Sequence, residues 1–234
     1  MGQVAFERDG DVAVITMDDG KANALSPSLI EEIGAAFDRA EQEAEAVVLT
    51  GREGRFCAGF DLKILMGGGQ PAKDLFMAGG ELFLRIYLHP QPVVTAATGH
   101  AIAGGALLLG VGDVRVGAIG DFKIGLNEIS IGVPLPVFAL EIAQAVIATP
   151  HLFDATLRAK VYRPTEAATV GWLNGAVDAS VLAETALREA NALAALPGKP
   201  FAISKHSQRR ALADRVRAVT EDDLEEILRR MSVG

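Results

Sequence analysis

Hydrophobic and polar residues alternate at the start of the chain and then recur at helical spacing. Residues 4–8 and 12–16 alternate on either side of Asp9-Gly10, a dipeptide typical of a tight turn, so we predict a β-hairpin. After Ser26-Pro27, apolar side chains recur every three or four positions through residues 27–44, which predicts a capped amphipathic helix. Short, continuous apolar runs predict buried strands at 46–50 and 93–97.

Strands become rare in the second half of the chain. Shorter strands are predicted at 113–116, 122–124 and within 171–178. The helical pattern predicts helices at 75–88, 137–147, 151–159, from 164 onward, 181–195, 201–217 and 221–231. Strands that alternate with helices predict an α/β fold. We therefore expect a core over residues 1–178 and a helical C-terminal region over 179–234.

Two of the predicted strands lead through glycine-rich turns toward helices. The strand at 46–50 is followed by Gly59, and the strand at 93–97 is followed by Gly104-Gly105. Backbone N–H groups at a helix start are free to bind an anion, or an oxygen that gains negative charge during a reaction. Either turn alone could serve only packing, but its repetition favours oxygen binding. The glycines of residues 67–71 predict a flexible break after the first turn.

Composition narrows the class of protein. The formal net charge is −8 with no basic tract, so we expect no nucleic-acid partner. The single cysteine, Cys57, excludes an internal disulfide and a cysteine-based zinc site, and the histidines show no metal spacing. No apolar run is long enough for a membrane span, and the first eight residues lack the pattern of a secretion signal. We expect a cytoplasmic protein without a membrane partner or a metal.

Four motifs, in this order, resemble those of the crotonase (enoyl-CoA hydratase/isomerase) superfamily. They are Asn23-Ala-Leu-Ser, Phe56-Cys-Ala-Gly-Phe-Asp-Leu, Gly99-His-Ala-Ile-Ala-Gly-Gly and Asp113-Val-Arg-Val. The resemblance implies a crotonase-like ββα superhelix with a helical C-terminal region. It also implies a homotrimer or a dimer of trimers, with that helical region contributing to trimer contacts and to the coenzyme A site. The expected substrate is a coenzyme A thioester, and no permanently bound cofactor is implied.

The resemblance also assigns roles to individual residues. The oxyanion hole would consist of the backbone N–H groups of Phe60 and Gly104. Coenzyme A would contact Lys21, Ala22, Ala24, Ala58, Asp61, Leu62 and Lys63. The acyl pocket would contain Leu65, Phe83, Leu107, Val133 and Phe138, with Phe76, Leu82 and Pro136 as further wall residues. Phe201 and Lys205 match C-terminal coenzyme A contacts only loosely.

One acidic residue then points to the reaction. Hydratases of the family carry two glutamates, but Leu107 occupies the position of the first and only the second, Glu128, is present. Leucine cannot hold a water molecule, whereas one glutamate can remove a proton from C2 and return it at C4. The sequence thus most resembles the Δ3,Δ2-enoyl-CoA isomerase branch. Apolar neighbours such as Ile129, Ile131 and Leu107 should raise the pKa of Glu128.

Several alternatives stay open at this stage. The chain is also compatible with an enoyl-CoA hydratase or another crotonase lyase, or with a non-catalytic acyl-CoA-binding homologue. Glu128 could be a solvated loop carboxylate, and Asn127 could orient it or simply form the turn. His100 and Cys57 are interpreted as structural residues, and Asp61 as a helix cap. Acyl chain length, trimer or hexamer, and a role in fatty-acid metabolism do not follow from the sequence.

Overall fold

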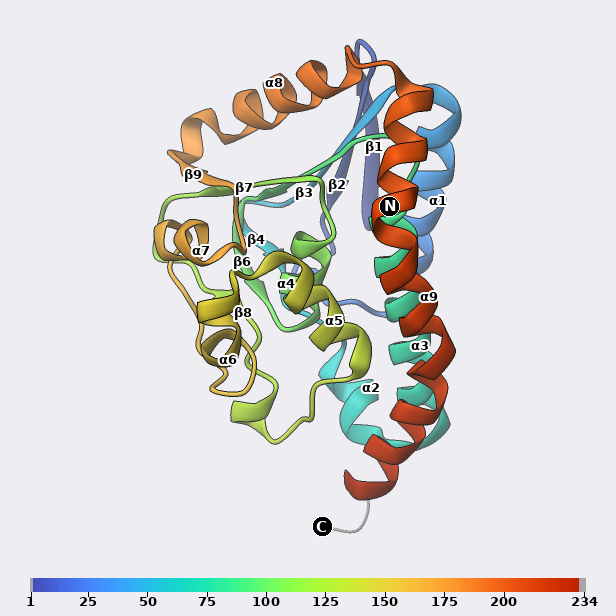
Figure 1. Cartoon of the computed structure of the whole chain (residues 1–234). Helices are drawn as coiled ribbons and strands as arrows, with labels where there is room; N and C mark the ends of the chain where they lie inside the picture. The colour runs from blue at the N-terminus through green and yellow to red at the C-terminus, as the bar shows by residue number, and fades with distance from the viewer. Residues whose placement is uncertain (1, 232–234) are drawn as a thin grey trace.

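The computed structural model describes residues 2–231, so residues 1 and 232–234 at the ends of the two expected regions lie outside it. The described chain contains two sheets, around which the helices are arranged (Figure 1). The larger sheet has the order β1 (Val4–Asp9), β2 (Val12–Met17), β3 (Ala46–Gly51), β5 (Val93–Ala97), β7 (Val114–Ala118) and β9 (Gly175–Val177). The smaller sheet has the order β4 (Gly54–Cys57), β6 (Gly99–Ile102) and β8 (Ile124–Gly125).

The predicted hairpin and buried strands are confirmed. Strand β1 pairs antiparallel with β2, and the pairs β2–β3, β3–β5, β5–β7 and β7–β9 are parallel. Successive residues of β3 enter different hydrophobic clusters: Val47 and Leu49 pack in the main core, and Val48 packs beneath a C-terminal helix. Because side chains of a strand alternate between faces, a continuous apolar run indicates a sheet covered on both sides.

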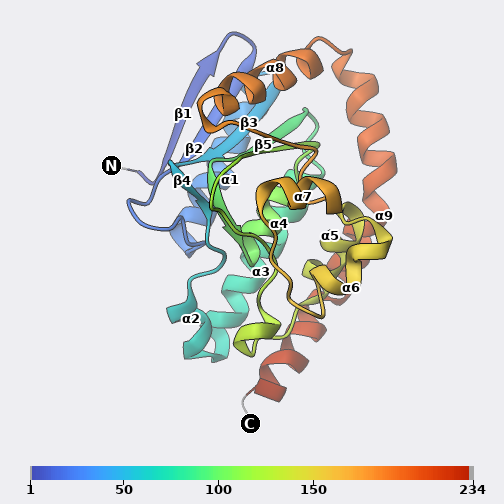
Figure 2. The ribbon, with the colours of Figure 1, turned by 90° about the vertical axis from the view of Figure 1, so that its left-hand side faces the viewer.

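Helices cover the larger sheet on both faces (Figure 2). Helix α8 (Leu182–Ala194) packs on β2, β3, β5 and β7, and α1 (Pro27–Glu43) packs on β1 and β2. Ser26 caps α1 by accepting a hydrogen bond from the N–H of Leu29, as its sequence predicts. The remaining helices are α2 (Leu62–Gly67), α3 (Gly69–Tyr87), α4 (Gly104–Gly110), α5 (Val137–Val146), α6 (Leu152–Ala155), α7 (Pro164–Val170) and α9 (Gly198–Met231).

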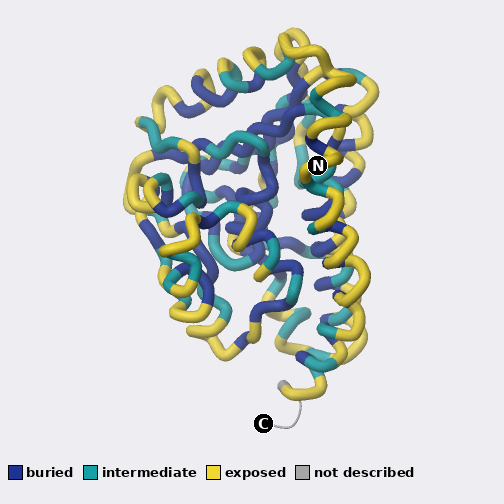
Figure 3. The backbone as a smooth tube through the Cα atoms, viewed as in Figure 1, coloured by how far each residue is buried: buried dark blue, intermediate teal, exposed yellow. Residues whose placement is uncertain are grey.

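The last helix differs from its prediction. Residues 201–217 and 221–231 were expected to form two helices, but α9 runs unbroken from Gly198 to Met231. The residues between them contain neither glycine nor proline, and the hydroxyl of Thr220 donates to the carbonyl of Val216 within the helix. Helix α9 packs along α3 and α5, so one face of it is buried over much of its length (Figure 3).

Glycine-rich segments account for the other differences. The break expected at residues 67–71 is confined to Gly68 and Gly69, which have φ values of +62° and +65°, and α3 begins at Gly69 rather than at residue 75. Both glycine turns contain short strands, β4 and β6, that their composition did not predict. Strand β8 begins at Ile124 rather than at residue 122, and the helix expected at 151–159 is only α6 after a 3₁₀ turn. These short strands are held by pairing partners distant in sequence, which local patterns do not report.

Candidate active site

The two glycine turns meet at the edge of the smaller sheet. Strands β4 and β6 are parallel neighbours, which brings the segments that follow them together. A Cβ atom added at Gly59 would lie 3.0 Å from the backbone nitrogen of Gly104. One added at Gly105 would lie 2.0 Å from the carbonyl oxygen of Cys57, closer than any real contact. Glycine is therefore required here because the two backbones touch.

Hydrogen bonding orients the first proposed donor. The N–H of Leu25 donates to the carbonyl of Gly59 at 2.8 Å, and the N–H of Asp61 donates to the carbonyl of Leu25 at 3.1 Å. In such a parallel bridge the intervening residue, Phe60, directs its own N–H to the opposite side. The N–H of Phe60 therefore points away from Leu25, to which Gly59 and Asp61 are hydrogen-bonded.

The second proposed donor lies at the start of α4. Ala103 has a φ of +55°, and its carbonyl accepts hydrogen bonds from the N–H groups of Ala106 and Leu107. Gly104 is the first residue of this helix, so its N–H has no acceptor within the helix. Phe60 and Ala103, the residue before Gly104, both line one cavity, whereas Gly104 itself is not among its lining residues. We therefore expect the N–H groups of Phe60 and Gly104 to face the same space.

That cavity is almost entirely apolar. It has a volume of about 80 Å³. The residues that line it are Ala58, Phe60, Leu62, Leu65, Phe76, Ile102, Ala103, Leu107, Asn127, Glu128, Ile131, Val133, Pro136, Phe138 and Ala139. Among these described residues Glu128 is the only one that ionises, and Asn127 is the only other one with a polar side chain. A single titratable group in an apolar cavity is typical of an acid–base centre.

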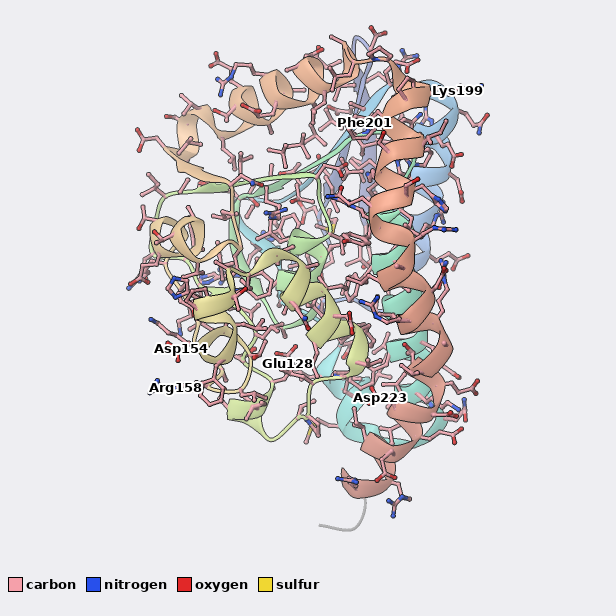
Figure 4. The ribbon with its side chains drawn as sticks, viewed as in Figure 1. Glu128, Asp154, Arg158, Lys199, Phe201 and Asp223 are labelled. Carbon is pink, nitrogen blue, oxygen red and sulfur yellow. The ribbon has the colours of Figure 1, made fainter. Side chains whose placement is uncertain are left out.

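Glu128 follows β8 and begins a 3₁₀ turn over Ile129–Ile131 (Figure 4). Its backbone carbonyl accepts hydrogen bonds from the N–H groups of Ile131 and Val133, which holds the turn closed. Burial raises the pKa of its carboxyl group to about 7, only partly offset by backbone hydrogen bonds from Glu128 and Asn127. Its Oε2 atom is buried and has no hydrogen-bond partner among the described residues. The carboxyl group is thus poised to exchange a proton near neutral pH.

Comparison with known proteins identifies the family. The family model described as enoyl-CoA hydratase/isomerase matches residues 7–229. This chain belongs to the enoyl-CoA hydratase/isomerase family. A structure of an enoyl-CoA hydratase/isomerase family protein from Pseudomonas syringae superimposes with a TM-score of 0.94 at 33% identity, over 96% of this chain and 98% of that one. The resemblance in sequence and the crotonase-like fold are thereby confirmed.

Relatives in this family carry the names of two different activities. Human mitochondrial enoyl-CoA delta isomerase 1 is 30% identical over 218 residues, which cover 91% of this chain and 71% of that protein. A probable enoyl-CoA hydratase of Bacillus subtilis is 33% identical over 143 residues, which cover 59% of this chain and 55% of that protein. Identity at this level assigns the enoyl-CoA hydratase/isomerase family without assigning one of its reactions.

A second, larger hollow adjoins the cavity in this family member. It has a volume of about 480 Å³ and shares Ala58, Phe60 and Leu62 with the cavity. The sequence-predicted coenzyme A contacts all line it: Lys21, Ala22, Ala24, Ala58, Asp61, Leu62 and Lys63. Asp61 also caps α2, as expected, by accepting a hydrogen bond from the N–H of Lys63 at 2.9 Å. The structure thus brings these seven residues together beside the candidate catalytic cavity.

A buried asparagine fixes the loop that forms one wall of this hollow. Asn23 is fully buried with a φ of +54°, a conformation that asparagine tolerates better than most residues. Its Nδ2 donates to the carbonyls of Met17 at 2.9 Å and Phe56 at 3.1 Å, and its Oδ1 accepts from the N–H of Asp19 at 2.9 Å. Sequence analysis recognised Asn23 as part of a motif but missed this positioning role.

The predicted acyl-pocket residues fall into two groups. Leu65, Leu107, Val133 and Phe138 line the cavity, as do Phe76 and Pro136. Phe83 does not: its ring lies behind those of Phe60 and Phe138, with centroids 5.9 and 6.0 Å away. Leu82 does not line the cavity either, and Ile129 is exposed outside it. Ile102, Ala103 and Ala139 line the cavity but were missed, because their placement depends on how the strands pair.

The other side chains singled out in the sequence do not line the cavity. Burial raises the pKa of Cys57 to about 12, which argues against a nucleophilic thiolate. His100 is part of the fold: its Nδ1 accepts from the N–H of Lys123 at 3.0 Å, and burial lowers its pKa. The Nζ of Lys205 donates to Asp113 at 2.6 Å and is almost fully buried, and Phe201 lies at the far end of α9 from Glu128 (Figure 4).

The described residues show neither a metal-binding cluster nor a helix that could span a membrane. In residues 2–231 there is no group of three or more histidine, cysteine, aspartate or glutamate side chains arranged to hold a metal ion. Within the same part of the chain, every helix is too short or too polar to cross a membrane.

Proposed function

We propose that this protein isomerises 3-enoyl-CoA to 2-enoyl-CoA and that Glu128 is its single acid–base group. The observation that carries the proposal is the composition of the cavity, in which Glu128 is the one ionisable side chain among the described lining residues and Leu107 contributes only hydrocarbon. The isomerase relative described above is consistent with this reaction.

The reaction needs two kinds of group. Glu128, as a carboxylate, removes a proton from C2 of the thioester, and the electron pair moves onto the thioester oxygen. The N–H groups of Phe60 and Gly104 stabilise that oxygen, and one such donor is typically worth about 3 kcal/mol. The resulting dienolate then takes the same proton from Glu128 at C4, which leaves the double bond between C2 and C3. The carboxylate is regenerated, and no water is consumed.

The binding of coenzyme A belongs to the same proposal. Lys21, Ala22, Ala24, Ala58, Asp61, Leu62 and Lys63 would hold the coenzyme A portion in the larger hollow, with the acyl group entering the cavity past Phe60. Coenzyme A serves here as part of the substrate, and no permanent cofactor is required. A homotrimer or a dimer of trimers in the cytoplasm remains our expectation for the assembly and its location.

Hydration is the second candidate, because one observation favours it. Asn127 Oδ1 is buried in the described structure without a hydrogen-bond partner, and Asn127 lines the cavity beside Glu128. Its backbone carbonyl, rather than its side chain, forms the turn by accepting from the N–H and hydroxyl of Ser130. A water held by Asn127 and Glu128 would allow addition to a 2-enoyl-CoA.

A paired assay separates the two reactions. Purified wild-type, Glu128→Gln and Glu53→Gln proteins are offered a 3-enoyl-CoA and, separately, a 2-enoyl-CoA, and product formation is followed. We expect isomerisation by the wild type, little hydration, and a loss of about 10²–10⁴-fold in Glu128→Gln. Glu53 is exposed outside the cavity, so Glu53→Gln should match the wild type. Hydration faster than isomerisation would favour the second candidate, and acyl-CoA binding without either reaction would indicate a non-catalytic homologue.

A further inference from the structure

Three aromatic rings form one wall of the cavity. Phe60, Phe76 and Phe138 all line it, and each ring touches the other two. The centroid of the Phe60 ring lies 5.1 Å from that of Phe76 and 6.3 Å from that of Phe138. All three residues are buried, with Phe138 fully so. Phe83 packs behind Phe60 and Phe138 and closes the space on their far side.

Helix α3 holds these rings in place. A Cβ added at Gly79 would lie 2.1 Å from Cε1 of Phe60, and one added at Gly80 would lie 3.2 Å from Cδ1 of Phe138. The helix backbone therefore lies directly against both rings. On the other side, a Cβ at Gly104 would lie 3.0 Å from Cε2 of Phe60. The Phe60 ring is thus wedged between α3 and α4 and has no room to move aside for a longer ligand.

The volume in front of this wall is small. An engineered apolar cavity of about 150 Å³ in another protein holds a benzene molecule. On that scale the cavity of about 80 Å³ takes roughly three to four carbon atoms. Because C1 and C2 of the thioester must sit at the oxyanion-binding turns, the room beyond them suits an acyl group of about five to six carbons in all.

We propose that the ring wall of Phe60, Phe76 and Phe138 limits this protein to short-chain enoyl thioesters, with Phe76 and Phe138 closing the end of the acyl site. This inference rests on the proposed function for the direction in which the acyl group enters. It goes beyond that function, since it names the chain length and the residues that set it. Phe76 and Phe138 act on the acyl end only, whereas Phe60 also carries an oxyanion donor on its backbone.

Binding of saturated acyl-CoA thioesters tests the wall without requiring turnover. Calorimetry compares chains of four, six, eight and ten carbons on the full-length wild type and on Phe76→Ala. In an open groove each buried methylene should tighten binding about fourfold. We expect the wild-type affinity to stop rising at about six carbons and to fall at least tenfold by ten. In Phe76→Ala the ten-carbon chain should bind at least tenfold more tightly than to the wild type.

Two further variants keep the test decisive. Phe37→Ala removes an equally buried ring from the core away from the cavity, so it should lose stability but keep the wild-type chain-length profile. Phe76→Leu replaces Phe76→Ala if the latter does not fold, and it should show a smaller shift in the same direction. Wild-type affinity that keeps rising to ten carbons would overturn the inference, as would an unchanged profile in the folded Phe76 variant.

The two proposals fail in different ways. Isomerisation of long-chain substrates at full rate would overturn the chain-length limit and leave the proposed function intact. A chain-length limit in binding without any isomerisation would overturn the proposed reaction and leave the wall intact. Absence of binding for every acyl-CoA would overturn both.

Discussion

Leu107 and Glu128 line the same cavity, one from α4 and the other from the turn after β8. The leucine contributes only hydrocarbon to the cavity, and among the described lining residues Glu128 is the one acidic side chain. Under the proposed function, proton transfer therefore rests on Glu128 alone, whose pKa is raised by burial rather than by a neighbouring charge.

The first prediction concerns the pH dependence of activity. Glu128 must be ionised to remove a proton, and the pKa of its carboxyl group is about 7. The value of kcat/KM for isomerisation should therefore rise about tenfold per pH unit below this pKa and level off above it. Initial rates between pH 5 and pH 9 provide the measurement. A profile already flat at pH 5 would contradict the assignment.

The raised pKa of Glu128 should also make the free energy of unfolding depend on pH. The folded protein retains the Glu128 proton up to a pKa of about 7, whereas the unfolded chain releases it near 4.5. This contribution to stability is fully present below pH 4.5 and is lost as the pH rises through 7, at a cost of about 3 kcal/mol. Urea unfolding should show Glu128→Gln gaining stability relative to the wild type at pH 8 but not at pH 4.5. Equal differences at both pH values would contradict the raised pKa.

Alanine substitutions at the adjacent glycines Gly104 and Gly105 of α4 should differ in their effects on stability and turnover. Gly105→Ala places a methyl group 2.0 Å from the Cys57 carbonyl, so it should destabilise the fold by about 3 kcal/mol or more. Gly104→Ala places a methyl group 3.0 Å from the Phe60 ring and 3.5 Å from the Cα of Gly59, a smaller overlap than at Gly105, so the protein should fold with a smaller loss of stability but lose about 10²–10³-fold in kcat as the donors shift. Gly175→Ala, where no atom lies within 4 Å, is the control. Thermal unfolding and turnover measured together distinguish the effects.

Replacing Asn23 should affect substrate binding more than the chemical step. Asn23→Ala leaves the buried carbonyls of Met17 and Phe56 without its amide donor, which should cost about 2–4 kcal/mol of stability. Because the loosened loop borders the larger hollow, we expect KM to rise at least fivefold with a smaller change in kcat. Asn191→Ala, on an exposed face of α8, should change neither. A fall in kcat with KM unchanged would contradict this positioning role.

The ion pair at the start of α9 should serve stability alone. Lys205 contacts Asp113 at 2.6 Å, and Arg209 contacts the same carboxylate at 2.9 Å. Lys205→Met removes one partner of a buried pair, so the free energy of unfolding should fall by about 2–4 kcal/mol. Because Lys205 is bound to Asp113 rather than exposed to a ligand, coenzyme A affinity measured by calorimetry should stay within twofold. A large loss of affinity would restore Lys205 as a coenzyme A contact.

Sequence patterns predicted most of the larger sheet, because its strands are continuous apolar runs or alternate cleanly. They failed for β4 and β6, where glycines are placed by contact between distant backbones and not by local preference. The candidate site followed from motif positions, and the residues predicted to contact coenzyme A line one hollow. Phe83 was predicted to line the cavity but packs behind Phe60 and Phe138, which do line it. Spacing in the sequence does not show whether a ring faces a cavity or packs against another ring.

The smaller sheet delivers the three proposed catalytic groups from three neighbouring strands. Phe60 follows β4, Gly104 follows β6, and Glu128 follows β8. The first two supply backbone N–H groups, whereas the third supplies a side chain. If the proposed function holds, a substitution at Glu128 would change the proton transfer and leave the two oxyanion donors in place. In this arrangement the backbone holds the two proposed oxyanion donors, and a single side chain supplies the proposed acid–base group.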